Sequence, residues 1–179
     1  MPVTSNTAGQ MYALTVLAPV VPEEVAALAQ TLERLPRRPS PLSRIALAHF
    51  ARWVIIHDFV SDPSQPQAEH LPGPYLLFSA TFDGDLEPFL EQLCVTIADE
   101  AEPIWSRCVG APLPARGEPL KAYLRHNQVQ TGLFFAAYPQ ASVREVVDAL
   151  AVREHAIDFA IRSQGMDDET LRRAFLAEF

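Results

Sequence analysis

The sequence has few cysteines, a deficit of positive charge and no long apolar run, and each shortage excludes a class of protein. Its 179 residues include two cysteines, Cys94 and Cys108, too few for a disulfide scaffold or a closed four-cysteine zinc site. Lys and Arg number 14 against 22 Asp and Glu, and the net charge of −8 argues against nucleic-acid or anionic-membrane partners. No stretch approaches the ~18 consecutive apolar residues of a membrane span. We therefore expect a globular protein with no nucleic-acid and no membrane partner.

The first ten residues lack the basic region and the apolar run of a signal peptide. Together with the two cysteines, this predicts a reducing, cytoplasmic location. Hydrophobic residues make up 49% of the chain and charged residues 20%, which is ordinary globular composition. The length fits a single domain over residues 1–179, with a helical extension at 166–179.

The common catalytic signatures are absent from the sequence. It contains no HExxH, CxxC, GxSxG, P-loop or GxGxxG motif, and no two of its five histidines have the i, i+4 spacing of a metal-binding helix. Both cysteines are expected to be buried thiols. The sequence predicts no metal site.

What the sequence does contain is a readable alternation of apolar patterns between three proline-rich loops. Runs rich in β-branched and aromatic residues predict strands at 11–18, 45–57, 75–82 and 131–138. Helical spacing predicts helices at 22–35, 85–101, 120–126, 142–165 and 167–179, with Pro103 ending or kinking the second near Glu102. The order is that of an α+β, ferredoxin-like βαββαβ antiparallel sheet with additional C-terminal helices.

Both faces of the predicted strands are substantially apolar. Two helices cover only one face, and the other, at roughly 440 Å², matches the largest apolar patch that a soluble monomer normally exposes. We therefore expect a homodimer in which a second subunit covers this face. The alternative is that the last two helices fold over it.

The long helix at 142–165 is apolar on two sides. Four residues lie within roughly 40° of the line through Val143 at 100° per residue, and three others lie opposite. The first group is Val147, Leu150, Ile157 and Ile161, and the second is Val152, Ala156 and Phe159. A helix of this kind is expected to lie between two bodies.

His49 and Arg52 are polar residues within an apolar strand, on opposite faces by alternation. A guanidinium in a strand that reads as buried needs a carboxylate, so Arg52 either forms a salt bridge to Asp83 or a helix acid, or anchors the carboxylate of a small anionic ligand. His49 is either a hydrogen-bonded core histidine or a general base or metal ligand.

Three further polar residues are ligand-binding candidates. Asp83 lies in a turn between a strand and a helix that Asp85 is expected to cap. Arg125 and His126 directly precede the last predicted strand. If a ligand binds, we expect Arg52, Asp83 and this pair to converge at one end of the sheet. The alternative is a pocket on the opposite face, with His49 as its leading titratable group. The loop from Asp58 to Gly73 is long enough to be a lid.

Several short blocks, spread over about Ile45 to Val147, resemble a poorly characterised family of bacterial proteins. They are His49-Phe50-Ala51-Arg52-Trp53, Leu77-Phe78, Phe82-Asp83-Gly84, Ile104-Trp105 with Cys108 and Gly110, Tyr123-Leu124-Arg125 with Gln128-Val129, and Ala137-Tyr138-Pro139. The resemblance implies a ferredoxin-like unit of the dimeric α+β barrel type. That superfamily includes dye-decolourising peroxidases, chlorite dismutases and small monooxygenases.

The block Ala80-Thr81-Phe82-Asp83-Gly84 is similar to the GxxDG motif of dye-decolourising peroxidases, in which the aspartate assists peroxide cleavage at haem. The resemblance thus makes haem a candidate cofactor, with His126 or His155 as the residue whose loss would remove it. No residue is assigned a catalytic role. The hypothesis is a cytosolic small-molecule-binding protein, with oxidoreductase activity of the dimeric α+β barrel type as one form of it. The alternative is a non-catalytic dimerisation or accessory binding module.

Overall fold

The computed structural model describes residues 6–60, 64 and 69–179, and in this part it contains a four-stranded antiparallel sheet and six α-helices. The α+β class expected from the sequence is confirmed. The chain divides into two compact units, the first ending at Val143 and the second covering Arg144–Phe179. The extension expected at 166–179 is therefore part of a longer helical unit. No helix in the described ranges is long and apolar enough to cross a membrane.

The sheet has the order β1-β2-β4-β3, with every neighbouring pair antiparallel. Its strands are β1 (Thr7–Ala8), β2 (Met11–Pro19), β3 (Ala48–Ile56) and β4 (Tyr75–Asp83). Three of the four predicted strands are confirmed, including the antiparallel pairing of 45–57 with 75–82. The second of them begins later than predicted, at Ala48, because residues 46–47 form a turn in which the N–H of Ala48 donates to the carbonyl of Ile45 at 3.0 Å.

The prediction of a fourth strand at 131–138 is wrong, although the chain just before it, at residues 127–129, does run beside β2. The backbone N–H of Leu17 donates to the carbonyl of Asn127 at 3.0 Å, and that of Val129 donates to the carbonyl of Thr15 at 2.8 Å. A single antiparallel bridge joins Val16 to Gln128. The ladder does not continue beyond this point.

Asn6 is the reason that the ladder stops. Its backbone carbonyl accepts from the N–H of Ala13 at 2.7 Å, and its side-chain oxygen accepts from the N–H of Thr131 at 2.8 Å. Asn6 and β1 thus occupy the edge of β2 that a longer fourth strand would need. Asn6 is 2% exposed, and its side chain connects the two segments.

Four helices belong to the first unit: α1 (Val25–Arg34), α2 (Leu86–Thr96), α3 (Ala98–Trp105) and α4 (Gly117–His126). The helix predicted at 85–101 is divided at Ile97, whose φ of −122° and ψ of 30° interrupt it. Pro103 lies inside α3 and does not end it. A proline ring clashes with the carbonyl four residues earlier, here that of Asp99, so the distortion falls ahead of the proline.

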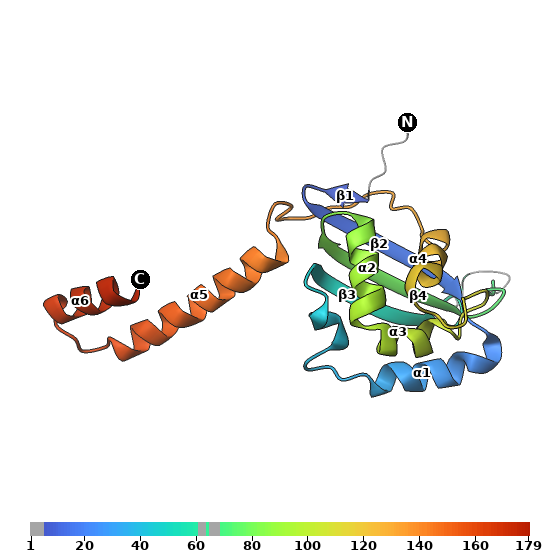
Figure 1. Cartoon of the computed structure of the whole chain (residues 1–179), viewed down its shortest axis with the longest axis horizontal. Helices are drawn as coiled ribbons and strands as arrows, with labels where there is room; N and C mark the ends of the chain where they lie inside the picture. The colour runs from blue at the N-terminus through green and yellow to red at the C-terminus, as the bar shows by residue number, and fades with distance from the viewer. Residues whose placement is uncertain (1–5, 61–63, 65–68) are drawn as a thin grey trace. The chain divides into compact units, whose positions relative to one another are not determined.

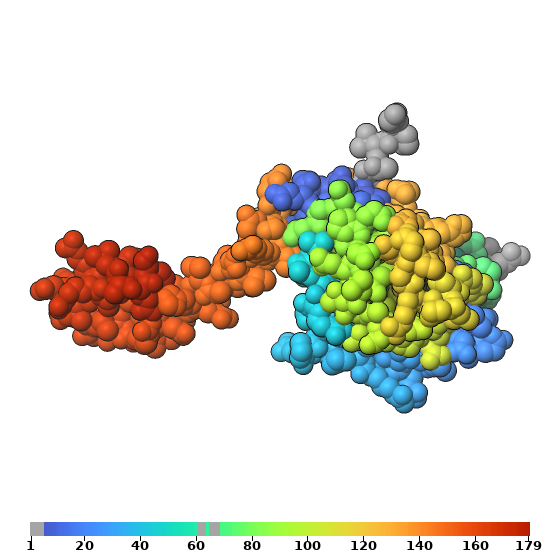
Figure 2. Space-filling view, viewed as in Figure 1, coloured from blue at the N-terminus to red at the C-terminus, as the bar shows by residue number. Residues whose placement is uncertain are grey.

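The core lies between one face of the sheet and these helices. Phe82 of β4 stacks on Phe89 of α2 with ring centroids 3.8 Å apart, and Phe78 meets Trp105 of α3 edge-on at 6.0 Å. All four side chains are fully buried. Figure 1 shows α2 and α4 in front of the sheet, and in Figure 2 they cover this side of the first unit. Among the described residues, no helix of this unit covers the other face of the sheet.

Gly9 offers a test of the contact that fixes residues 127–139 beside β2. Its φ is +60°, and an added Cβ would lie 2.3 Å from the carbonyl oxygen of Pro139. We expect Gly9→Ala to lower the free energy of unfolding by about 3 kcal/mol, from left-handed strain and from displacement of the Pro139 backbone. Gly84 is the matched control, because its φ is +79° but a Cβ there meets nothing within 4 Å. Urea denaturation should give about 1 kcal/mol for Gly84→Ala, and equal losses would contradict the steric account.

The second unit is a pair of helices, α5 (Val143–Arg162) and α6 (Asp168–Glu178). The side chain of Asp167 accepts from the N–H of Thr170 at 3.0 Å and so caps α6. Phe159 of α5 packs edge-on against Phe175 and Phe179 near the end of the chain. Neither helix contains a buried residue.

Candidate functional site

The face of the sheet that the helices of the first unit leave uncovered is called the open face. It carries a shallow depression of about 490 Å³. Aromatic side chains and hydroxyl groups line it together with one cation. These residues are Thr15, Phe50, Arg52, Ser79, Thr81 and Phe134. The centre of this face therefore contains both polar and apolar side chains. It is less apolar than the alternation of residues along the strands predicts. Phe50 is nevertheless 79% exposed, a large apolar surface left in contact with water.

Arg52 lies on β3 directly opposite Ser79 on β4. Its Nε donates to the Ser79 hydroxyl at 3.1 Å. Arg52 is exposed, and it has no carboxylate partner within the described ranges. The salt bridge to Asp83 does not form, because the register places Arg52 opposite Ser79, four residues before Asp83 along β4. Both carboxylate oxygens of Asp83 have other partners.

Those partners of Asp83 are His49 and the backbone of Val143. His49 Nε2 lies 2.7 Å from Asp83 Oδ1, and the N–H of Val143 donates to Asp83 Oδ2 at 2.7 Å. The side chains of His49 and Asp83 are 9% and 15% exposed. The pair is thus largely shielded from solvent, and both carboxylate oxygens of Asp83 have a hydrogen-bond partner within the first unit.

A β-bulge brings His49 to Asp83. Between Ala48 and Phe50 the register shifts, so that two steps along β3 match one step along β4. Bulges redirect side chains, and this one breaks the simple alternation that placed His49 and Arg52 on opposite faces. Asp83 shares its strand face with Thr81 and Ser79 by alternation, so His49 reaches the rim of the open face.

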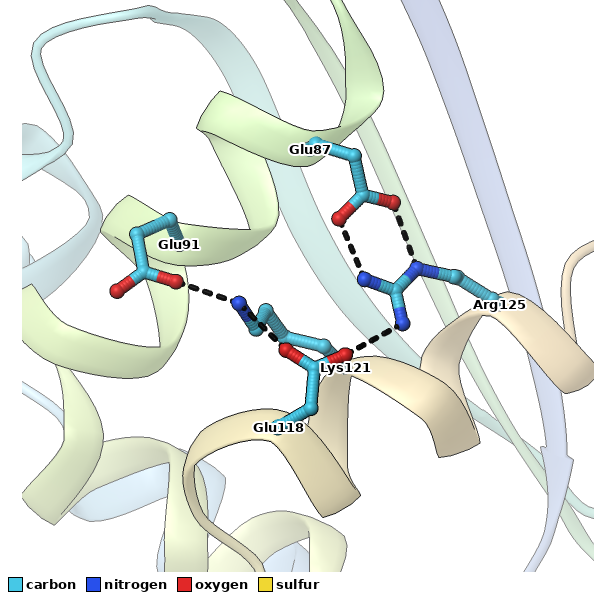
Figure 3. A network of polar contacts seen from close by, with 5 residues as sticks. All are labelled: Glu87, Glu91, Glu118, Lys121 and Arg125. Carbon is cyan, nitrogen blue, oxygen red and sulfur yellow. Dashed lines mark hydrogen bonds and ion pairs between the residues drawn. The ribbon is translucent and has the colours of Figure 1, made fainter.

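Arg125 lies elsewhere, in the helical layer on the covered side of the sheet. Its guanidinium forms a two-pronged ion pair with Glu87 of α2, and it also contacts Glu118 at 2.9 Å. Lys121 bridges Glu118 and Glu91 at 2.8 and 2.5 Å (Figure 3). The network ties α2 to α4.

The charges in this network perturb one another. Hydrogen bonds from Arg125 lower the pKa of Glu87, and hydrogen bonds from Lys121 and Arg125 lower the pKa of Glu118. The carboxylates in turn raise the pKa values of Lys121 and Arg125. The cation of Arg125 is therefore already neutralised. The expected convergence of Arg52, Asp83 and Arg125 does not occur, and His126 is an exposed residue at the end of α4.

The two cysteines do not offer a nucleophile. Both are 4% exposed, and burial raises the pKa of the Cys94 thiol to about 11 and that of Cys108 to about 12. Thiols with such values stay protonated at neutral pH and are poor nucleophiles. In the described part of the chain, no three His, Cys, Asp or Glu side chains are gathered around a common point where a metal ion would fit.

The loop considered as a lid is described only at its two ends, since 61–63 and 65–68 lie outside the described residues. Asp58 joins these ends, because its carboxylate lies 2.6 Å from His70 Nδ1 and accepts from the N–H of Leu71 at 2.8 Å. The hydrogen bond with His70 is the main cause that lowers the pKa of Asp58 to about 2. Asp58 therefore fixes the two ends of the loop close to each other.

Sequence reasoning missed the hydroxyl groups of the open face. Thr15, Ser79 and Thr81 are small polar residues in otherwise apolar strands, and they share a face with Arg52 in the observed register. The spacing of two between Ser79 and Thr81 along the strand predicted at 75–82 is a usable signal. The contribution of Phe134 had no such signal, since it depends on the irregular path of residues 127–139.

Comparisons with known proteins found no relative of this chain. No protein-family model, no curated protein and no solved structure matches the chain.

Proposed function

We propose that this protein binds a small organic anion on the open face of its sheet, with Arg52 as the anchor for the acidic group. The observation that carries the proposal is the guanidinium of Arg52, which donates to Ser79 and has no carboxylate partner in the described part of the chain. It lines a depression in which aromatic side chains and hydroxyl groups are combined. A carboxylate, sulfonate or phosphate would accept from the guanidinium nitrogens that Ser79 does not use.

The surroundings of Arg52 favour a ligand with an apolar body. Phe50 and Phe134 flank the depression, and its volume falls within the range of small-molecule sites. A ring or branched chain laid between them would remove exposed aromatic surface from water. The hydroxyls of Thr15 and Thr81 supply hydrogen bonds that fix orientation.

We propose further that the first unit has the ferredoxin-like arrangement. In support, residues 127–129 run antiparallel to β2 on the side away from β4, where a fourth strand of that arrangement belongs. Helices lie on one face of the sheet, as the arrangement requires. The bacterial family suggested by the sequence remains part of this proposal.

An oxidoreductase activity rests on the sequence resemblance alone. Within the described residues, the depression is lined by no histidine, cysteine, methionine or tyrosine, so it offers no axial ligand to haem iron. His155 contacts Glu178 and Phe179 within the second unit. The lining does not fit haem, and we derive no step through it. The alternative function, a dimerisation module, is favoured by the exposed apolar side chains along one side of α5.

The binding proposal is tested with 8-anilinonaphthalene-1-sulfonate, an aromatic anion whose fluorescence rises in apolar surroundings. Arg52→Met keeps an apolar stem and removes the charge. We expect it to weaken binding of the probe by about 10- to 100-fold, the range of one charge-assisted hydrogen-bonding group. Arg34→Met, which removes an exposed cation from the last turn of α1, should leave binding unchanged. Equal affinity of Arg52→Met and the unmodified protein would refute the role of Arg52.

A further inference from the structure

The helix α5 has two different sides, and α6 uses only one of them. The ring of Phe159 packs against Phe175 and Phe179 with centroids 5.9 and 5.6 Å away. His155 Nε2 lies 3.1 Å from Glu178, which also pairs with Arg162. His155, Phe159 and Arg162 lie about 100–160° around the helix from Val143 at 100° per residue. The contacts with α6 are therefore confined to the far side.

The other side of α5 carries an apolar stripe, which we call the seam. It consists of Val143, Val147, Leu150, Glu154, Ile157 and Ile161. Steps of four and three alternate along it, which is the 3.5-residue repeat of a helix that packs along another helix. Val147, Leu150, Ile157 and Ile161 are 56, 53, 42 and 62% exposed.

A helical pair with such a surface lacks the burial that keeps helices folded. Neither α5 nor α6 contains a buried residue, and most helical stability in proteins comes from packing of an apolar face. The rings of Phe159, Phe175 and Phe179 pack together only on the far side of α5. The apolar side chains of the seam are therefore left without packing within α5 and α6.

We propose that the seam of α5 packs against the seam of α5 from a second copy of this chain, with the two helices antiparallel. This alignment places Val143 opposite Ile161 of the second copy, and Val147 opposite Ile157 of the second copy. Leu150 then lies opposite Glu154 of the second copy, beside the two-fold axis near residue 152. Every apolar seam residue near the ends of the interface meets another apolar residue.

The charges beside the seam are complementary in this alignment. Arg144 comes beside Asp158 of the second copy. Arg153 comes within reach of Glu154 of the second copy, which offsets the proximity of the two copies of Arg153 across the two-fold axis. Each pair occurs twice by symmetry, so the one acid in the seam has a cation within reach. Within one chain, Arg144 lies 3.7 Å from Asp148, a long contact, and both side chains are exposed. A parallel alignment would instead place Glu154 directly against its own copy, which is unfavourable.

The oligomeric state of the full chain tests the proposal. Light scattering during gel filtration at tens of micromolar should give twice the chain mass of 19.8 kDa. Leu150→Glu should weaken the dimer by at least about 100-fold, because each dimer loses two buried leucines and gains two acids beside Glu154. Val152→Glu is the matched control, since Val152 is 61% exposed and lies on the far side of the same helix. A monomeric unmodified chain, or equal effects of the two variants, would overturn the proposal.

A cross-linking experiment tests the direction of the helices. In the antiparallel alignment, the two copies of residue 151 lie about 3 Å apart along the axis, and the two copies of residue 147 about 15 Å apart. A short bis-maleimide should therefore join Ala151→Cys chains efficiently and Val147→Cys chains poorly. The unmodified chain, whose two cysteines are buried, supplies the background. Preferential cross-linking through residue 147 would show a parallel pair and overturn the proposed alignment.

Discussion

Phe82→Ala is expected to lower the free energy of unfolding of the first unit by about 3–5 kcal/mol. Phe82 is fully buried, and its ring is stacked between those of Tyr12 at 5.2 Å and Phe89 at 3.8 Å. Truncation leaves a cavity bounded by β2, β4 and α2, three elements that cannot collapse together without breaking the sheet register. A loss of this size is a large fraction of the 5–15 kcal/mol that stabilises a typical domain.

Phe50→Ala supplies the comparison for this experiment. It removes the same ring from the same sheet, but at a position that is 79% exposed, so we expect a change within about 0.5 kcal/mol. Urea unfolding followed by tryptophan fluorescence measures both variants. Trp53 and Trp105 are the two tryptophans of the chain, and both lie in the first unit. Equal losses for the two variants would contradict the assignment of the helix-covered face as the core.

Asp83→Ala is expected to cost about 2–4 kcal/mol, which is large for an aspartate at the end of a strand. Removing the carboxylate leaves the ring nitrogen of His49 without its acceptor in a site that is 9% exposed, at about 1–3 kcal/mol. It also removes the acceptor for the N–H of Val143, the first residue of α5, at about 1 kcal/mol.

Asp85→Ala tests whether the effect belongs to this carboxylate or to any acid in the turn. Asp85 occupies the N-cap position of α2, as the sequence predicted, but its side chain forms no capping hydrogen bond. We therefore expect a loss below about 0.5 kcal/mol. A double-mutant cycle with His49→Ala should show coupling of about 1 kcal/mol or more between His49 and Asp83. Additive losses from the two single substitutions would show that the pair does not act together.

The candidate site could be predicted only in part from the sequence. Asp83 and His49 were both singled out, but the bulge that joins them depends on the register between β3 and β4. The position of Arg125 before a predicted strand predicts that it lies near Arg52. Its real partners, Glu87 and Glu118, lie on α2 and on the first turn of α4. Ion pairs between helices depend on how the helices pack, and the order of residues along the chain does not contain that information.

The sequence by itself determined the α+β class, the three long strands and the two-sided character of α5, because these follow from local periodicity and from the burial of apolar side chains. Tertiary structure alone decided that residues 131–138 do not form a strand. Asn6 and β1 occupy the edge of β2 with which those residues would pair, and this overrides their strand propensity. It also decided that Arg52 stands exposed beside Ser79 and that Asp83 pairs with His49. A hydrogen-bonding group takes the partner that the assembled fold brings within about 3 Å, and that choice becomes readable only when the strands are in register.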